Sequence, residues 1–152
     1  VDMVAHILDC LRDQAQTAVN NFIEFYPGLK VLKEEQIPND ARQGHFKGFD
    51  GRFVSVVSEH LVLAGYLQNG ESCIMKTAAG IWYPRLVKEK IPFKFINFVH
   101  DEWQTEVDDD DDLCDYVGGI QADAIVKAGE ILNLNCPQAG EIKKGYNWYQ
   151  TH

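Results

Sequence analysis

The sequence lacks a long apolar run and has no excess of positive charge. No stretch approaches the ~20 consecutive apolar residues that a transmembrane helix needs, so we expect no membrane partner. Lysine and arginine together number 14, against 23 aspartates and glutamates, and the formal net charge is −9. Nucleic-acid-binding surfaces usually carry a basic patch, whereas the basic residues here are scattered. Charge alone therefore argues against binding nucleic acid through a basic face of this chain.

The cysteines lack the close spacing of metal ligands. They are Cys10, Cys73, Cys114 and Cys136, with no Cys-x-x-Cys pair among them. A zinc site needs closely spaced thiolate or imidazole ligands, so this spacing argues against one. Free and mostly buried thiols are typical of a reducing compartment, and we expect a cytoplasmic protein.

The length and composition favour one domain with a core of its own. The chain has 152 residues, of which 45% are hydrophobic, and it shows no internal repeat. It begins with Val1 rather than Met, from which we expect a processed chain or a piece of a longer protein.

The first third of the chain predicts helix followed by loop. Apolar residues recur at steps of three and four over residues 3–25, which predicts one amphipathic helix that packs in a core or an interface. Pro27 and Gly28 are expected to end it. A short helix is expected over residues 29–36, and the prolines, glycines and aspartates of residues 37–51 predict a loop.

The middle of the chain predicts a short strand and a long helix. Residues 53–57 are rich in β-branched residues, and a helix is expected from about Glu59 to Trp82. This helix is unusually rich in glycine, alanine and serine. Small side chains allow close approach of another backbone or of a DNA groove, or simply tight packing within the protein, and the sequence leaves both open.

A β-hairpin with a charged turn is the most informative feature of the sequence. Two runs of β-branched and aromatic residues within 94–107 flank His100, Asp101 and Glu102. Adjacent carboxylates at a rigid strand end can bind a divalent cation that itself binds phosphate. A solvated polar turn is the alternative, because tight turns favour polar residues.

The last third predicts a helix with an acidic beginning. Five aspartates, residues 108–112, precede an apolar-periodic stretch at about 113–132, and acidic residues stabilise the first turn of a helix. A second metal-binding role for these aspartates stays open. Residues 136–152 predict a turn followed by an irregular or strand segment.

Val99–Glu102 resembles the third conserved motif of family A DNA polymerases, the family of bacterial DNA polymerase I. Other stretches resemble family segments in the same order. They are Phe22–Leu29 with its Tyr-Pro-Gly, the Gly-Arg turn Gly48–Arg52, the palm-helix segment Leu67–Gly70 with Ile74–Lys76, and the terminus Gly145–His152. The resemblance covers nearly the whole chain and is nearest to the replicative polymerases of podovirus-type phages.

The resemblance implies an α+β fold in which the antiparallel hairpin of a polymerase palm packs on long helices. Residues 1–47 would be the end of the fingers region, and residues 48–152 would be the palm with the catalytic hairpin. The resemblance also implies two Mg²⁺ ions, primer-template DNA and deoxynucleoside triphosphates as cofactors and partners.

The resemblance assigns roles residue by residue. Asp101 would be a metal ligand, Glu102 an auxiliary carboxylate, and His100 a neighbour of the primer terminus. Gln68 would reach the DNA minor groove, where an amide donor meets acceptors common to all base pairs. Arg52 would contact a backbone phosphate, which positions DNA without reading sequence.

Some motifs of the family are missing from this chain. The first catalytic motif, Asp-x-Ser with a following Glu-Leu-Arg, is not in the sequence, and neither is the fingers helix that binds the triphosphate. An asparagine of the minor-groove network is replaced by Ala64. We therefore expect the C-terminal part of a DNA-directed DNA polymerase, inactive alone, whose active site is completed by a separate N-terminal polymerase chain or a missing N-terminal part.

Two alternatives remain open at this stage. A non-catalytic palm remnant that binds DNA or protein would tolerate the loss of Asp101. A small metal-dependent phosphohydrolase would use Asp101, Glu102 and the aspartates at 108–112, and it would need a complete carboxylate cluster within this chain.

Overall fold

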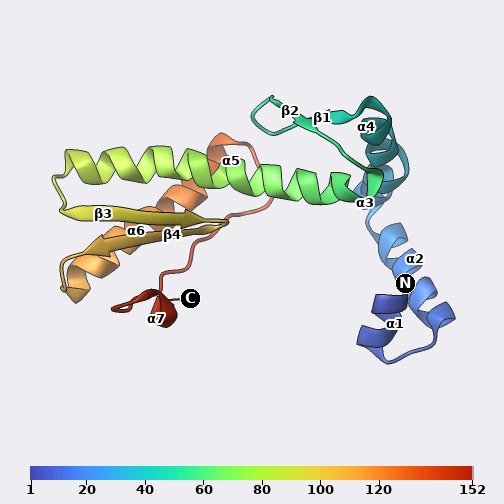
Figure 1. Cartoon of the computed structure of the whole chain (residues 1–152), viewed down its shortest axis with the longest axis horizontal. Helices are drawn as coiled ribbons and strands as arrows, with labels where there is room; N and C mark the ends of the chain where they lie inside the picture. Colours follow the sequence, from blue (N-terminus) through green and yellow to red (C-terminus); the bar gives the residue numbers. More distant parts are fainter. Residues whose placement is uncertain (152) are drawn as a thin grey trace. The chain divides into compact units, whose positions relative to one another are not determined.

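A computed structural model describes residues 1–151, so His152, the last residue of the polymerase-like terminus, lies outside the described residues. The chain divides into two compact units (Figure 1). The first unit comprises Val1–Lys47 and Phe53–Gly65, and the second comprises Gly48–Arg52 and the chain from Tyr66 onward.

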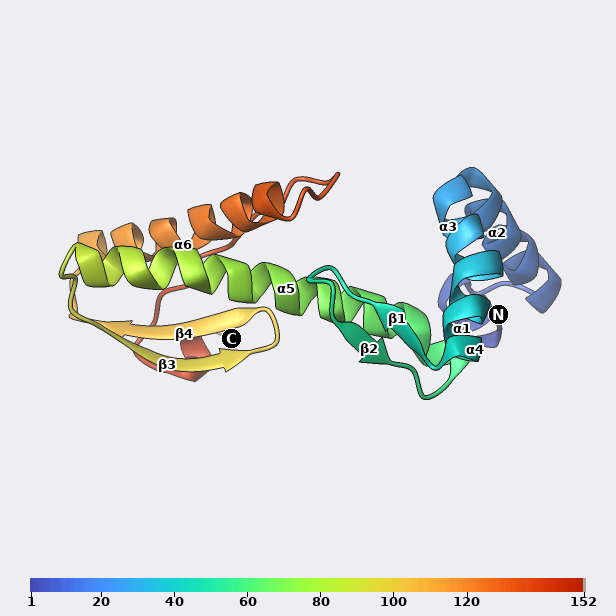
Figure 2. The ribbon, with the colours of Figure 1, turned by 90° about the horizontal axis from the view of Figure 1, so that it is seen from above.

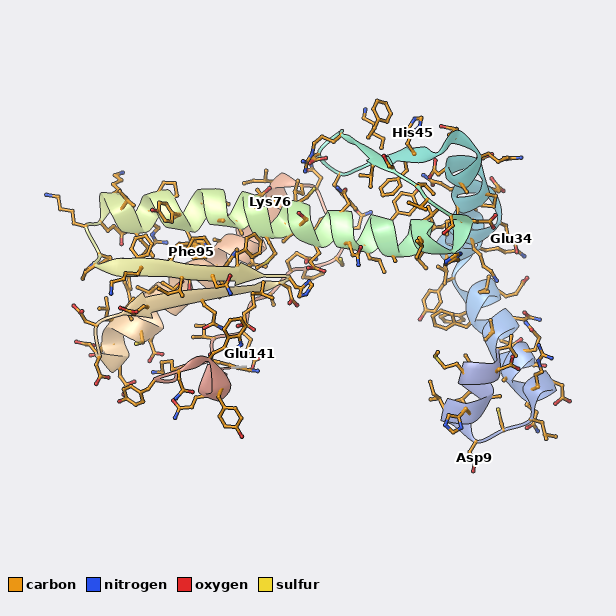
Figure 3. The ribbon with its side chains drawn as sticks, viewed as in Figure 1. Asp9, Glu34, His45, Lys76, Phe95 and Glu141 are labelled. Atoms are coloured by element: carbon orange, nitrogen blue, oxygen red, sulfur yellow. The ribbon has the colours of Figure 1, made fainter. Side chains whose placement is uncertain are left out.

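The first unit begins with two helices where the sequence predicted one. Helix α1 spans Asp2–Leu8 and helix α2 spans Arg12–Phe25. Asp9 lies between them in the left-handed conformation, with φ 49° (Figure 3). The Cys10 amide donates to the Ala5 carbonyl at 3.1 Å, which closes the end of α1. The prediction of an unbroken helix over residues 3–25 was wrong because the apolar spacing continues across this break.

The next segment is also more helical than predicted. Helix α3 spans Pro27–Val31, the π-helical turn η1 spans Leu32–Gln36, and α4 spans Ile37–Gln43. Proline is tolerated in the first turn of a helix, where its missing amide is not needed. The proline at the start of α4 therefore begins a helix, and the loop predicted for residues 37–51 was wrong over this part. Helix α4 ends at Gly44, which has φ 73°.

A small antiparallel sheet completes the first unit. Strand β1 spans His45–Lys47 and pairs with β2, Phe53–Ser55, within the strand predicted at residues 53–57. The ring of Phe46 is buried and lies against Gly65, where a Cβ atom would come within 3.1 Å of it. Gly65 is therefore explained by packing within the chain.

The helices of residues 1–36 bury almost nothing. Within this segment only Ala15 is buried. The large apolar side chains of α1–α3 and their connections are mostly exposed, and we call them the N-terminal apolar surface: Met3, Ile7, Leu8, Leu11, Phe22, Phe25, Tyr26 and Val31. Of the two predicted roles for the first helical stripe, core or interface, the core role is not seen in this chain, and the interface role stays a prediction.

The second unit combines two long helices with a hairpin. Helix α5 spans Glu59–Lys88, of which residues 66–88 belong to this unit, and it continues beyond the predicted end at Trp82. Strands β3, Phe93–Val99, and β4, Glu102–Val107, form the predicted hairpin. Helix α6 spans Asp111–Ile131, and the irregular tail ends in the short helix α7, Trp148–Thr151.

The core of the second unit is built around Trp82. Its side chain is fully buried. The centroid of its ring system lies 5.3 Å from that of Phe95 on β3 and 5.5 Å from that of Trp103 on β4. The buried residues come from α5 and α6: Ala78, Trp82, Leu86, Val117, Ile120, Ala124 and Ala128. Helices α5 and α6 thus lie side by side with the hairpin packed against them (Figure 2), which confirms the predicted α+β arrangement.

The acidic start of α6 forms as predicted. Asp110 is the N-cap, and its carboxylate accepts the Leu113 amide at 3.0 Å. Lys144 of the tail pairs with Asp111 at 3.1 Å and with Asp115 at 2.9 Å. Among residues 1–151, no helix combines the length and apolarity needed to cross a membrane.

Candidate functional site

The hairpin turn brings together the three ionisable residues predicted from the sequence. Val99 and Glu102 are paired across the strands, so His100 and Asp101 form the turn itself. His100 has φ 52°, a conformation that is uncommon for residues other than glycine, although histidine is among those enriched there. His100 and Asp101 are exposed, and Glu102 is half-buried. The turn presents one freely accessible carboxylate and one partly enclosed carboxylate.

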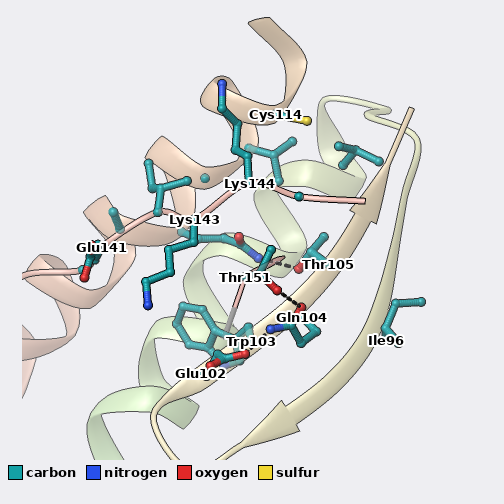
Figure 4. A pocket seen from close by; sticks show the side chains of 18 of the residues that line it. Ile96, Glu102, Trp103, Gln104, Thr105, Cys114, Glu141, Lys143, Lys144 and Thr151 are labelled. Atoms are coloured by element: carbon teal, nitrogen blue, oxygen red, sulfur yellow. Dashed lines mark hydrogen bonds between the residues drawn. The ribbon is translucent and has the colours of Figure 1, made fainter. Parts of the chain in front are cut away.

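Glu102 belongs to a hydrogen-bonded chain that runs to the tail. Gln104 donates its side-chain amide to Glu102, two residues away on the same face of β4. The amide oxygen of Gln104 accepts the Thr151 hydroxyl at 3.4 Å (Figure 4). The Glu102 carboxylate is therefore oriented by a neighbour on its own strand, and that neighbour contacts α7.

A wide hollow lies beside the hairpin turn. It has a volume of about 1260 Å³, and residues of α5, the hairpin, α6 and the tail line it, Asp101 and Glu102 among them. Gln121 of α6 donates to Thr105 at 2.8 Å within it (Figure 4). Lys144 also lines the hollow. The arrangement offers oxygen ligands and a cationic side chain around a space that is open to a large polar molecule.

The carboxylates of the turn form a partial metal site. Among the described residues, no group of three or more histidines, cysteines or acidic residues is close enough to hold a metal ion. Mg²⁺ commonly takes one or two carboxylates from a protein and completes its shell with water and substrate oxygens. Asp101 and Glu102 fit that share of a magnesium site. The phosphohydrolase hypothesis needs a fuller cluster than the described residues supply.

The aspartates at 108–112 lie at the other end of β4 from Asp101. A strand rises about 3.3 Å per residue, so the length of β4 separates the two acidic groups by roughly 20 Å. Asp110 caps α6 and Asp111 pairs with Lys144, which accounts for both carboxylates structurally. The structure therefore does not support a second metal-binding role for the aspartates at 108–112.

Besides His100, the residues predicted to contact DNA are Gln68 and Arg52, which lie on neighbouring segments of the second unit. Gln68 is exposed on α5, and Arg52 is exposed at the end of the segment Gly48–Arg52. The Asp50 carboxylate accepts the Arg52 Nε at 2.5 Å and the Arg52 amide at 3.2 Å. These hydrogen bonds lower the pKa of Asp50 and raise the pKa of Arg52.

Asn69, which the sequence analysis did not single out, joins these two segments. Its side-chain oxygen accepts the Phe49 amide at 2.9 Å. The ring of Phe49 lies against Gly70, where a Cβ atom would come within 3.0 Å of it. Gly70, like Gly65, is thus explained by tight packing within the chain, while a Cβ at Gly80 would meet open space. In the sequence, the signal that could have pointed to Asn69 is its position between Gln68 and Gly70.

The fold of the chain is that of part of a DNA polymerase domain. The POL domain of Pol1 from M. smegmatis, solved in complex with DNA primer-template and dNTP, matches with a TM-score of 0.79 at 15% sequence identity. The match covers 97% of this chain and 27% of that chain. At this identity the likeness establishes the fold.

The sequence is similar to part of a phage polymerase. A DNA-directed DNA polymerase of Escherichia phage Phieco32 is 28% identical over 155 residues, covering 92% of this chain and 24% of the phage protein. No family model matches the chain. The predicted resemblance to a DNA polymerase is confirmed, whereas closeness to the podovirus type remains a prediction. The chain spans about a quarter of the length of the polymerases it matches.

Proposed function

We propose that this chain is part of a DNA-directed DNA polymerase and supplies the His-Asp-Glu turn of its nucleotidyl-transfer site. The observation that carries the proposal is the similarity to a phage DNA polymerase over 92% of the chain. The exposed acidic turn on a rigid hairpin supports it, because a catalytic carboxylate must be both accessible and fixed. The work would take place in the cytoplasm of an infected host cell.

The acidic pair would hold the magnesium ions of the reaction. Asp101 is the proposed ligand, and Glu102, oriented by Gln104, is the auxiliary carboxylate. Bound Mg²⁺ would supply activation of the primer hydroxyl and neutralisation of the triphosphate charge. His100 would lie against the primer terminus, since it shares the turn with Asp101.

The DNA would be positioned by α5 and the segment before it. Gln68 is exposed and would donate to minor-groove acceptors near the primer end, which tests base-pair geometry without reading sequence. Arg52 would pair with a backbone phosphate, as its side chain is exposed although tied to Asp50.

The catalytic site would be completed by an N-terminal polymerase part. The sequence contains neither the first catalytic motif nor the triphosphate-binding helix. The N-terminal apolar surface supports such a partner, because helices that bury a single alanine need another surface on which to pack. The proposal is thus of a shared site, with this chain inactive alone.

Primer extension with Mg²⁺ and deoxynucleotides tests the proposal. The chain is assayed alone, with an upstream polymerase part that carries the first motif and the fingers helix, and in the same mixture with Asp101→Ala. Extension is expected only in the mixture, and Asp101→Ala should lower it by at least about 10³-fold if a metal ligand is lost. Asp123→Ala removes an exposed acid from the middle of α6 and is the matched control.

Two results would contradict the proposal. Extension by the isolated chain would remove the need for a shared site. Extension by the Asp101→Ala mixture at the unaltered rate would remove the metal role of the turn. A mixture that binds primer-template without extending it would favour the non-catalytic palm remnant instead.

A further inference from the structure

The segment Gly48–Arg52, which we call the Gly-Arg loop, contacts α5 at neighbouring positions, and its backbone is hydrogen-bonded to the helix at Asn69. The Asn69 side-chain oxygen accepts the Phe49 amide at 2.9 Å, and it also lies 3.9 Å from the Cys73 thiol. Gly48 fits so closely against Asn69 that a Cβ atom would come within 2.5 Å of the same oxygen. The loop and the helix are in contact through backbone as well as side chain, and both belong to the second unit.

Hydrogen bonds within the loop connect the segment held by Asn69 to Arg52. The Gly48 amide donates to the Arg52 carbonyl at 2.8 Å, and the Gly51 amide donates to the Gly48 carbonyl at 2.9 Å. Asp50 binds both the amide and the guanidinium of Arg52. The two ends of the loop are joined and Asp50 holds Arg52, so the loop moves as one piece, and the hydrogen bond that links its backbone to the helix is made at Asn69.

Gln68 is next to that attachment point. Consecutive helical residues point about 100° apart, because one turn takes 3.6 residues. Asn69 is half-buried against the loop, and Gln68 is exposed. One turn of α5 therefore fixes the loop with one amide side chain and presents the other amide to solvent.

We propose that Asn69 is a positioning residue that makes Arg52 and Gln68 a single DNA-contacting unit. Arg52 would take a backbone phosphate and Gln68 a minor-groove edge of the same duplex, at a separation set by the Phe49–Asn69 hydrogen bond. The inference rests on the proposed function. Fixing the loop in advance removes the ordering cost that a free loop would add to binding.

A double-mutant cycle on DNA binding tests the proposal. Fluorescence anisotropy measures the affinity of the chain, mixed with its upstream part, for a labelled primer-template over a range of salt concentrations. The variants are Asn69→Ala, Arg52→Ala and the double variant, with Thr77→Ala, farther along the same helix, as the control. Hydrogen exchange of the Phe49 amide, in the chain without DNA, measures how well the hydrogen bond between Phe49 and Asn69 is kept.

We expect Asn69→Ala to weaken binding about 5- to 10-fold, the size of one lost hydrogen bond. It should lower the slope of log affinity against log salt by roughly 0.9, as Arg52→Ala does, because both lose the same phosphate contact. In the Arg52→Ala background it should retain only the part of its effect that acts through Gln68. Phe49 exchange should accelerate in Asn69→Ala and be restored in Asn69→Asp, whose carboxylate accepts the same amide.

The opposite results would overturn the proposal. Accelerated Phe49 exchange with unchanged DNA affinity would show that this hydrogen bond serves only the fold. Effects of Asn69→Ala and Arg52→Ala that add in full would show that Asn69 does not act through the loop. If the wild-type mixture extends primers and the variants give either of these results, this inference fails and the proposed function stands. A mixture that neither binds nor extends primer-template DNA would sink the proposed function with it.

Discussion

Residues 1–36 and the helix pair α5–α6 use apolar side chains in opposite ways. The first segment contains two amphipathic helices and buries only Ala15. Helices α5 and α6 bury a continuous cluster around Trp82, with the hairpin packed on it. Periodicity in a sequence shows which helix face needs to be covered, but it does not show whether the same chain provides the cover.

The difference has an energetic meaning. Full burial of a large apolar side chain is worth about 1.5–3 kcal/mol, and side chains left exposed contribute little. The stability of this chain should therefore come mainly from the second unit. The N-terminal apolar surface should contribute to association instead, which gives four tests in order of decreasing effect.

Truncation of the central tryptophan should have the largest effect. Trp82→Ala removes a fully buried ring that contacts both strands and should lower the free energy of unfolding by about 3–5 kcal/mol. Urea unfolding followed by circular dichroism measures it. Met3→Ala, at a side chain that is 75% exposed, should change the same quantity by less than about 0.5 kcal/mol. Equal losses in the two variants would break the comparison.

Polar substitution in the N-terminal apolar surface should weaken assembly while leaving folding intact. Phe25 is 76% exposed, and Phe25→Ser should cost about 1–3 kcal/mol of binding to the upstream polymerase part if the ring anchors that interface. Titration calorimetry measures the affinity. Val57→Ser, at an exposed apolar position outside this surface, is the control. Unchanged affinity in Phe25→Ser would show that the partner packs elsewhere.

Loss of a helix cap in the second unit should have an intermediate effect. Asp110→Ala removes the acceptor for the Leu113 amide at the start of α6 and should lower the free energy of unfolding by about 1 kcal/mol. Urea unfolding again measures the change. Asp112→Ala removes a neighbouring charge without removing the cap, so it should cost less. If Asp112→Ala cost as much, the helix dipole rather than the cap would be responsible.

The smallest effect concerns an exposed carboxylate in each region. The pKa of Glu89 is lowered by hydrogen bonds from Arg85 and Tyr116, and the pKa of Glu24 is lowered by Lys30. A carboxylate whose folded pKa is depressed contributes stability above its unfolded pKa and loses it as the pH falls through the folded pKa. Carboxyl titration by nuclear magnetic resonance should find both pKa values below the ordinary glutamate range. In Arg85→Ala, the pKa of Glu89 should rise while that of Glu24 stays unchanged.

Much of the second unit could be predicted from sequence because its signals are local. The hairpin and the acidic start of α6 each follow from short patterns, and the turn residues 100–102 are neighbours in the chain. The break at Asp9 could not be predicted, because the apolar spacing runs through it. Helix α4 was missed because a proline in a first turn resembles a proline in a loop. The Phe49–Asn69 contact joins residues 20 positions apart, and no local pattern encodes it.

The placement of the indole rings has a spectroscopic consequence. Trp82, Trp103 and Trp148 all belong to the second unit. Trp82 and Trp103 lie 5.5 Å apart and, among the described residues, have no hydrogen-bond partner for their buried ring N–H groups, while Trp148 is 45% exposed. Fluorescence excited selectively at tryptophan will therefore come from the second unit and not from the first. Quenching by a nucleotide or a duplex would assign that ligand to the half of the chain that carries the acidic turn.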